Sequence, residues 1–292
     1  MIASYIASIG PKMDVQEDMV RHVVMNTLRS SVFKNKSIYG NDIYIACDST
    51  NYWRKSVFPH YKASRKKARE DSKIDWSKLF LFLNKIRDEI RETFPYKVIW
   101  VPNTEADDII ASICFGAGET EEPILRSGAE KPILIISGDK DFIQLQSFSN
   151  VKQFSPVTKK FIENNNPTEY LIYHIMNGDK DDGIPNILSP DDVFVSGGRQ
   201  ASMLKTFIDS VTKKIIVENK TPAEIFTDEN HLRNWERNQS LIDLKCIPGN
   251  ILASIDAEIT RQQNKEVKDK SKLFKYFAGN NLKVMLEKLG DF

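Results

Sequence analysis

The feature that most constrains this chain is a short apolar run that ends in two aspartates. Residues 133–136 read Ile-Leu-Ile-Ile, and Asp139 and Asp141 follow after Ser137-Gly138. A continuous apolar run of this length is typical of a strand buried on both faces of a parallel sheet. Ligands of open α/β sheets bind beyond the carboxyl ends of the strands, where these two carboxylates lie. One such pair also occurs in ordinary turns and helix caps, so it does not define a site alone.

The first half of the chain alternates between strand and helix patterns. Strands are expected over residues 42–48, 97–101 and 133–136, with an edge strand at 151–154. Helices are expected over 2–9, 14–33 and 76–94 and from Thr104, with a polar loop over 116–131. This order predicts an α/β fold, a parallel sheet flanked by helices. Beyond a composition change at residues 159–167 the patterns are almost wholly helical, so we expect an α/β core over 1–160 and a helical region over 161–292.

The composition is that of an ordinary globular protein, with 41% hydrophobic and 28% charged residues among 292. Cys47, Cys114 and Cys246 show no metal-binding spacing, and an odd number argues against a disulfide framework. The N-terminus lacks the basic start of a signal peptide, and no apolar stretch approaches membrane-spanning length. We therefore expect a cytoplasmic protein without a membrane partner.

The net charge of +1 conceals an uneven distribution. Within residues 52–73, the stretch from Arg54 to Arg69 contains seven cations and no acid. Aromatic residues are interleaved with them: Tyr52, Trp53, Phe58, His60 and Tyr61. A cationic groove with aromatic platforms suits single-stranded nucleic acid. The alternative is a solvated basic helix whose aromatic residues pack in the core. We favour binding, because the aromatic spacing forms no clean apolar stripe.

Acidic residues follow each of three predicted strands. They are Asp48, then Glu105, Asp107 and Asp108, then Asp139 and Asp141; Asp179 and Asp182 come later, after a predicted helix. Each group alone could cap a helix, and Thr104 and Asp107 have capping-box spacing. Gathered together, the carboxylates would repel and raise one another's pKa, so they need cations. Oxygen ligands without a nearby His or Cys select Mg²⁺ or Mn²⁺, and pairs of such ions commonly serve phosphodiester hydrolysis.

Several short motifs run in order along almost the whole chain. They are Met19-Val-Arg-His-Val23, Cys47-Asp48, Tyr52-Trp-Arg54, Tyr61-Lys62, Glu105-Ala-Asp107-Asp108, Asp139-Lys-Asp141-Phe142, Val151-Lys-Gln-Phe-Ser-Pro156 and Gly178-Asp-Lys-Asp-Asp182. In these motifs the chain resembles the 5′-nuclease (flap endonuclease) family, and within it the ribonucleases H of T-even bacteriophages, which are primer-removing 5′→3′ exonucleases. The resemblance implies a PIN-like 5′-nuclease core. It also implies an all-helical C-terminal region, in which residues 178–186 belong to a helix–turn–helix-like element that grips duplex DNA.

The resemblance also implies roles for individual residues. The first metal would be held by Asp48, Glu105, Asp107 and Asp139, and the second by Asp141, Asp179 and Asp182. The catalytic residues would be Lys62, Asp48, Asp107 and Asp139, whereas Asp108 could serve as a helix cap. Tyr61 would stack on a base. The opening for a 5′ single strand would be lined by Arg54, Arg65, Lys66, Lys67 and Arg69, with Lys62 reaching the scissile phosphate.

Two features depart from the family pattern. Family members begin with a buried strand that ends in a metal-binding aspartate, whereas here residues 2–9 match the helix that follows that strand. We therefore expect the first strand to be missing and the natural start to lie upstream of Met1. The second departure is Asp182-Gly-Ile-Pro-Asn186 in place of Asp-Asn-Ile-Pro-Gly, which argues against a monovalent ion held by this loop.

These observations lead to one main hypothesis. The chain would be a Mg²⁺-dependent, structure-selective 5′→3′ exonuclease and flap endonuclease with two metal sites, Mn²⁺ serving as a substitute. It would remove RNA primers and adjacent DNA at replication forks, acting on forked or 5′-flap DNA and RNA–DNA hybrid. We expect a monomeric phage protein in the host cytoplasm, with a single-strand-binding protein and a sliding clamp as partners, the latter through Leu289-Gly-Asp-Phe292.

Two alternatives remain open. The first is a catalytically impaired protein that binds forked DNA and lacks the first metal ligand. The second is a compact ribonuclease of the toxin type, which fits poorly because it would leave the long helical C-terminal half unexplained.

Overall fold

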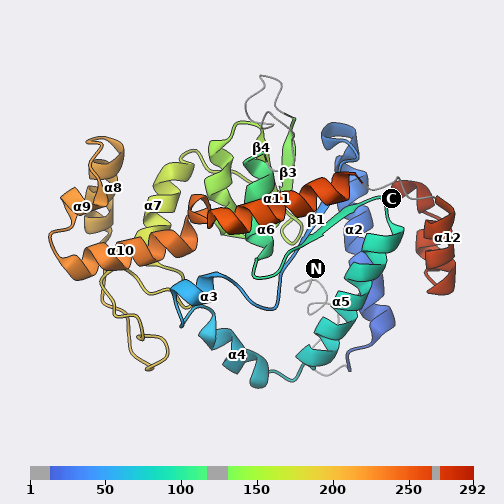
Figure 1. Cartoon of the computed structure of the whole chain (residues 1–292), viewed down its shortest axis with the longest axis horizontal. Coiled ribbons are helices and arrows are strands. Elements are labelled where there is room, and N and C mark those ends of the chain that lie inside the picture. The colour runs from blue at the N-terminus through green and yellow to red at the C-terminus, as the bar shows by residue number, and fades with distance from the viewer. Residues whose placement is uncertain (1–13, 117–130, 265–269) are drawn as a thin grey trace.

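The computed structural model describes residues 14–116, 131–264 and 270–292 (Figure 1). The molecule is elongated: α8 and α9 lie at one end, α12 at the other, and α11 runs across the middle (Figure 1). The helix expected over residues 2–9 and most of the loop expected over 116–131 lie outside the described residues. Helix α4 (Ala63–Glu70) is described, but the side chains of Lys66 and Lys67 are not.

The strands form two small sheets. Strand β1 (Tyr44–Cys47) pairs in parallel with β2 (Lys97–Trp100). Strand β4 (Val151–Ser155) lies between β3 (Ile133–Ile136), to which it is parallel, and β5 (Lys160–Ile162), to which it is antiparallel. The expectation of an edge strand at 151–154 was therefore wrong, because β5 covers its outer side. The parallel directions are as predicted, but among the described residues no hydrogen-bonded ladder joins β3 to β1 or β2.

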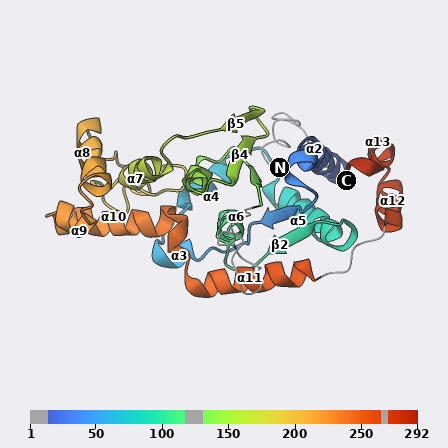
Figure 2. The same cartoon turned by 90° about the horizontal axis from the view of Figure 1, so that it is seen from above.

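The two sheets are held together by side chains. Ile99 and Val101 at the end of β2 share one buried cluster with Ile135 of β3 and Val151 of β4. Helices on the two sides complete this cluster: α6 (Ala106–Cys114), the 3₁₀ segment η1 (Lys140–Ser147) and α11 (Gly249–Gln263). Figure 2 shows α11 running along one side of β2 and α6. Burial of these apolar side chains thus keeps the carboxyl ends of β1, β2 and β3 near one another.

Two further clusters complete the core. The first contains side chains of α2 (Glu17–Tyr39), α5 (Trp76–Thr93), α12 (Lys270–Gly279) and α13 (Lys283–Leu286). The other joins Phe58 and Tyr61 to α7 (Pro167–Asn177), α8 (Lys205–Ile216) and α10 (Glu229–Ile242), with Phe226 at the end of α9 (Pro222–Ile225). All three clusters combine residues from before and after residue 160. The division at residue 160 stays a prediction.

The C-terminus is docked on this core. The ring centroid of Phe292 lies 5.0 Å from that of Phe277 and 5.8 Å from that of Phe94. Asp291 forms a 2.8 Å ion pair with Arg29 of α2. The tail from Leu289 therefore packs against its own chain, and its aromatic side chain is not free for a sliding clamp in this arrangement. In the part of the chain that is described, no helix combines the length and apolar character that crossing a bilayer requires.

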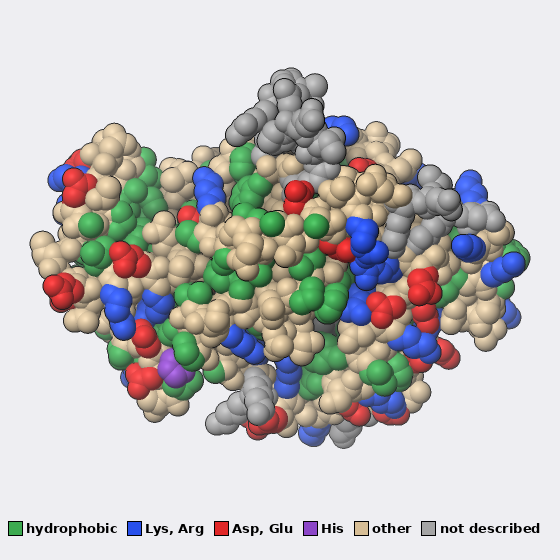
Figure 3. All heavy atoms as spheres, in the orientation of Figure 1, with side chains coloured by type: hydrophobic (Ala, Val, Ile, Leu, Met, Phe, Trp, Pro, Cys, Tyr) green, Lys and Arg blue, Asp and Glu red, His purple; other side chains and the backbone are tan. Residues whose placement is uncertain are grey.

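Charges of both signs are interspersed on the face that carries α11. Figure 3 shows acidic and basic side chains alternating with apolar ones across this face, without a large field of one sign. This mixture agrees with the near-zero net charge of the sequence.

The ring cluster around Phe94 gives a test of the fold. Phe94 is fully buried, so Phe94→Ala should lower the free energy of unfolding by about 3–5 kcal/mol, through lost contacts and the cavity left behind. Urea denaturation checks this value. Phe33→Ala is the matched control, because 54% of Phe33 is exposed, and it should change stability by less than about 0.5 kcal/mol. Equal effects of the two variants would contradict this packing.

Candidate active site

The start of α6 joins the ends of β1 and β2. Asp48, directly after β1, accepts a hydrogen bond from the backbone N–H of Ala106 (2.8 Å). The capping box consists of Glu105 and Asp108, one residue later than the predicted pair, while Thr104 Oγ1 donates to the carbonyl of Val101 (2.8 Å). Asp107 therefore takes no part in capping, and its carboxylate is left for the site.

The buried guanidinium of Arg54 compensates the charges of Glu105 and Asp108, the first group of acids. Arg54, of helix α3 (Arg54–Val57), is 3% exposed. It donates to Glu105 Oε2 (2.9 Å) and to the carbonyl of Leu241 (2.9 Å), and it pairs with Asp108 Oδ1 (2.8 Å). Asp108 is fully buried and also accepts from Trp53 Nε1 (3.1 Å). These contacts favour a structural role for Asp108, in line with the helix-cap interpretation.

Tyr61 and Lys62 link α6 to the acidic loop that follows α7. The hydroxyl of Tyr61 lies 2.9 Å from both Glu105 Oε2 and Asp182 Oδ2. Lys62 Nζ pairs with Glu105 Oε1 and lies 3.4 Å from Asp182 Oδ2, and its backbone N–H donates to the carbonyl of Asp182 (2.7 Å). Burial alone would raise the pKa of Glu105, but Lys62 and Arg54 hold it below the usual range. At Asp182 burial prevails over Lys62 and Arg65, and the pKa of this carboxyl is raised.

Asp107, Asp139 and Asp141 form a second group of acids, whose charges are less well compensated. Burial, and then the charge of Asp139, raise the pKa of Asp107 well above its usual range, against the opposing effect of Lys62. Asp139 begins η1 and accepts from the N–H of Asp141 (3.1 Å). Burial is also the main reason why the pKa of Asp141 rises to about 7, with Asp139 adding to it and His174 opposing it. This side of the cluster is where an added cation would be most favourable.

A tight turn brings the last two acids to the cluster. Gly178 ends α7 with a φ of +66°, and a Cβ there would lie 2.3 Å from the carbonyl oxygen of Ile184, so only glycine fits. Asp179 accepts from the N–H groups of Asp181 (2.8 Å) and Asp182 (3.2 Å). The turn therefore directs Asp179 and Asp182 toward Asp141 and Tyr61.

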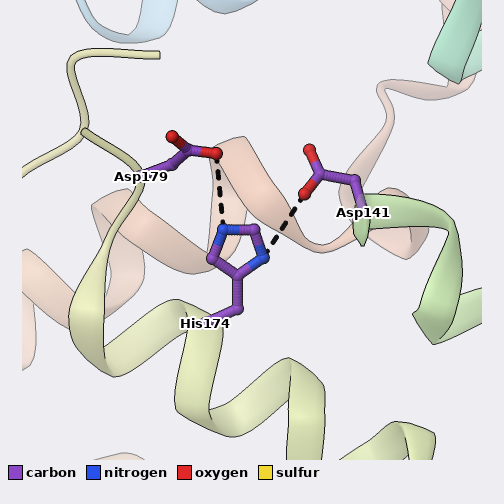
Figure 4. Close-up of side chains that lie close together, drawn as sticks. All are labelled: Asp141, His174 and Asp179. Atoms are coloured by element: carbon purple, nitrogen blue, oxygen red, sulfur yellow. Dashed lines mark ion pairs between the residues drawn. The ribbon is translucent and has the colours of Figure 1, made fainter. Parts of the chain in front are cut away.

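The sequence reasoning missed His174 and assumed that no histidine lay nearby. His174 Nδ1 lies 3.4 Å from Asp141 Oδ1, and its Nε2 lies 3.5 Å from Asp179 Oδ2, so that the ring stands between the two carboxylates (Figure 4). Asp179 and the other acids raise the pKa of His174, although burial alone would lower it. A signal existed in the sequence, because His174 lies on the predicted helix only five residues before the first acid of the following loop.

Four of the seven predicted metal ligands line one cavity, whereas Asp48 and Asp139 are exposed beside it and Glu105 is buried in the ion-pair network. Asp107, Asp141, Asp179 and Asp182 line one small cavity of about 10 Å³, together with Arg54 and Tyr61. This volume is about that of one water-sized species. Four carboxylates around such a space are suitable donors for a hard divalent cation, so the residues fit the predicted metal. Asp48 lies at the edge of the same region, against the first turn of α6.

The predicted nucleic-acid contacts are only partly accessible. Arg54 and Tyr61 are each 3% exposed and engaged in the contacts above, so Arg54 does not line an opening and Tyr61 has no face free for a base. Trp53 and Phe58 are also buried, so the expectation that these aromatic residues form platforms was wrong: they are core residues. Arg65 is partly exposed while paired with Asp182, and Arg69 is exposed above the Phe80 ring.

Comparisons with known proteins define the class of this fold. Residues 4–172 match the family model described as 5′-3′ exonuclease, N-terminal resolvase-like domain, and residues 167–292 match T4 RNase H, C terminal. The solved T5 D15 protein, co-crystallised with metal ions, has a TM-score of 0.56 at 16% identity, covering 83% of this chain and 96% of that one. The T5 D15 flap endonuclease in a complex with DNA and metal ions has a TM-score of 0.54 at 15% identity, with coverage of 82% and 91%. The fold is thus a resolvase-like 5′-nuclease fold with a helical C-terminal region.

Relatives in sequence narrow the class further. Ribonuclease H of Enterobacteria phage T4 is 28% identical over 299 aligned residues, which cover 100% of this chain and 92% of the relative. The 5′-3′ exonuclease of Buchnera aphidicola subsp. Acyrthosiphon pisum is 28% identical, with 54% of this chain and 51% of the relative covered. The chain belongs to the 5′-3′ exonuclease family, with a C-terminal region of the T4 ribonuclease H type.

The buried guanidinium of Arg54 gives a stability test. Arg54→Met removes the partner of two buried carboxylates and should lower the free energy of unfolding by about 3–5 kcal/mol, as breaking a buried ion pair does. Lys55→Met is the control, because Lys55 is exposed on the same turn and should shift stability by less than about 0.5 kcal/mol. Chemical denaturation at neutral pH measures both. A loss for Arg54→Met no larger than for Lys55→Met would show that the network is not needed for folding.

Asp107 gives a test of pH dependence. Its pKa is raised in the folded state, so its contribution to stability is present below its unfolded pKa of about 3.9 and is lost as the pH rises through the folded value. With chelator present, Asp107→Asn should therefore be more stable than the parent at pH 8, and this difference should shrink at pH 4. Urea titrations at the two pH values measure it, with exposed Asp192→Asn as the control. A difference independent of pH would contradict the electrostatic explanation.

Proposed function

We propose that this protein is a divalent-metal-dependent, structure-selective nuclease that cuts from the 5′ end at junctions between single and double strands. Its substrates are forked or 5′-flap DNA and RNA–DNA hybrid, and its role is the removal of RNA primers and adjacent DNA at replication forks. The observation that carries this proposal is the convergence of Asp107, Asp141, Asp179 and Asp182 on one cavity. Family membership supports it independently.

The acidic side chains divide into two groups around two cation sites. Asp48, Asp107 and Asp139 would hold the first ion and Asp141, Asp179 and Asp182 the second, with Mg²⁺ as the native ion and Mn²⁺ as a substitute. Bound ions of this kind neutralise charge on a phosphodiester and lower the pKa of an attacking water.

Glu105 was predicted as a ligand of the first ion, but its contacts suggest a different contribution. One oxygen accepts from Arg54 and Tyr61, and the other pairs with Lys62. These contacts use most of its acceptor capacity, so Glu105 positions Lys62 beside the acidic cluster.

Lys62 is the cation placed to act on the scissile phosphate. Its side chain is 9% exposed and lies between Glu105 and Asp182, and those two acids keep its pKa above the usual value although burial opposes this. The ammonium therefore stays charged and can stabilise negative charge that develops on the phosphate. Arg65 and Arg69, with Lys66 and Lys67 on the same helix, would attract the phosphate backbone of the 5′ strand through charge.

The turn at residues 178–186 is proposed as the contact with the duplex. Residues 178–181 of this turn are half-buried or exposed, whereas residues 182–186 are buried, so a duplex would meet the turn at residues 178–181. A helix–turn–helix-like element here would bind phosphates without reading bases, which suits selection for structure instead of sequence. The T5 flap endonuclease solved with DNA and metal ions supports a DNA substrate for this fold.

A binder without catalysis is the second candidate. It is favoured by the ion-pair network of Glu105, Lys62, Asp182 and Arg65, which compensates part of the acidic cluster without any added ion. A cleavage assay separates the two candidates.

The decisive experiment uses a 5′-labelled flap substrate with Mg²⁺ or with chelator. We expect short 5′ products with Mg²⁺ and none with chelator. Asp139→Asn should lower the rate by about a hundredfold or more, since even outer-shell partners of metal ligands commonly cost about 10–100-fold. Asp192→Asn should cleave like the parent. Tight binding of the flap without cleavage in Mg²⁺ or Mn²⁺ would support the binder and contradict the nuclease.

A further inference from the structure

His174 occupies an unusual position for a histidine on a helix. It lies in the last turn of α7, and its ring inserts between Asp141 of η1 and Asp179 of the turn that follows the helix (Figure 4). Its side chain is 14% exposed. One ring nitrogen and one oxygen from each carboxylate lie within 4.8 Å of one another. Three potential ligand atoms from three elements are thus grouped together, with each ring nitrogen facing a different carboxylate.

The spacing is close to that of a coordination sphere. Ligands about 2.1 Å from one ion lie at most about 4.2 Å apart, so side-chain movements of about half an ångström would close this set around a cation. Only one ring nitrogen can bind the ion. The other remains close to one of the two carboxylates, and a carboxylate on the second nitrogen is the usual device that orients a metal-binding imidazole.

We propose that His174 is a nitrogen ligand of the second cation site and shifts the preference of that site from Mg²⁺ toward Mn²⁺ and later transition ions. The inference rests on the proposed function, because Asp141 and Asp179 are the ligands assigned there to the second ion. Magnesium prefers oxygen ligands and a regular octahedron. An imidazole nitrogen binds transition ions more strongly, so one histidine among carboxylates distinguishes this site from an all-oxygen one.

A different explanation would also place His174 between two acids. The imidazolium form could act as an internal counter-ion that holds Asp141 and Asp179 together and leaves when a metal binds. The two explanations differ in one observable. A ligand remains within bonding distance of the bound ion, whereas a counter-ion competes with it.

The test is electron spin echo envelope modulation on the full-length protein loaded with Mn²⁺ at less than one and at two equivalents, so that the second site is sampled whichever site fills first. We expect modulation from a histidine ¹⁴N nucleus that changes when histidine is labelled with ¹⁵N. The coupling should persist in His22→Gln, an exposed position on α2, and disappear in His174→Gln. Because no histidine was predicted for the first site, such a coupling identifies the second.

Calorimetry supplies a matched second readout. His174→Gln should lower Mn²⁺ affinity by about tenfold or more while changing Mg²⁺ affinity by less than about threefold, because glutamine offers an oxygen. Bound Mn²⁺ without histidine coupling in the parent protein, or tighter Mn²⁺ binding in His174→Gln, would overturn this inference and leave the proposed function intact. Failure of Mn²⁺ to bind at all would overturn both. The spin echo measurement on the parent protein tests the inference even if His174→Gln does not fold.

Discussion

The structure depends on how the negative charges of several carboxylates, gathered in a small and partly buried space, are compensated. Burying such charges is unfavourable unless cations or hydrogen bonds compensate them. On one side the chain provides compensation of its own, since Arg54 pairs with both Glu105 and Asp108, Lys62 pairs with Glu105, and Arg54 also binds the carbonyl of Leu241 near the end of α10. The same interaction therefore balances charge and joins the sheet region to the helical region.

On the other side compensation is incomplete, and the proposed function depends on this asymmetry. The pKa values of Asp107 and Asp141 are raised, mainly by burial, whereas that of Glu105 is lowered by its cationic partners. Groups whose charged form is destabilised in this way are the ones that gain most from a divalent cation. Under the proposed function, Asp107 and Asp141 are therefore the acids that gain most from a bound cation.

The basic stretch within residues 52–73 shows where reasoning from the sequence was limited. Its aromatic residues were interpreted as stacking platforms because they form no regular apolar stripe. In the structure Phe58 and Tyr61 are buried against α7 and α10, in a short irregular segment where helical periodicity does not apply. Periodicity reports burial only inside regular helices and strands. His174 was missed for a different reason: its partner Asp141 lies on the distant η1 segment, and only the tertiary structure brings the two together.

By itself the sequence determined the local elements and the acidic character of the site. The apolar run at 133–136, the helices expected over 14–33 and 76–94 and the acids after each strand follow from neighbouring residues, because strand and helix preferences and turn geometry are local. The first of these helices extends further, to Tyr39. Only the tertiary structure decided which charges pair. It split the strands into two sheets, placed Arg54 and Tyr61 in the interior and set His174 between Asp141 and Asp179. These outcomes depend on contacts between residues far apart in the chain, whose energies no local pattern contains.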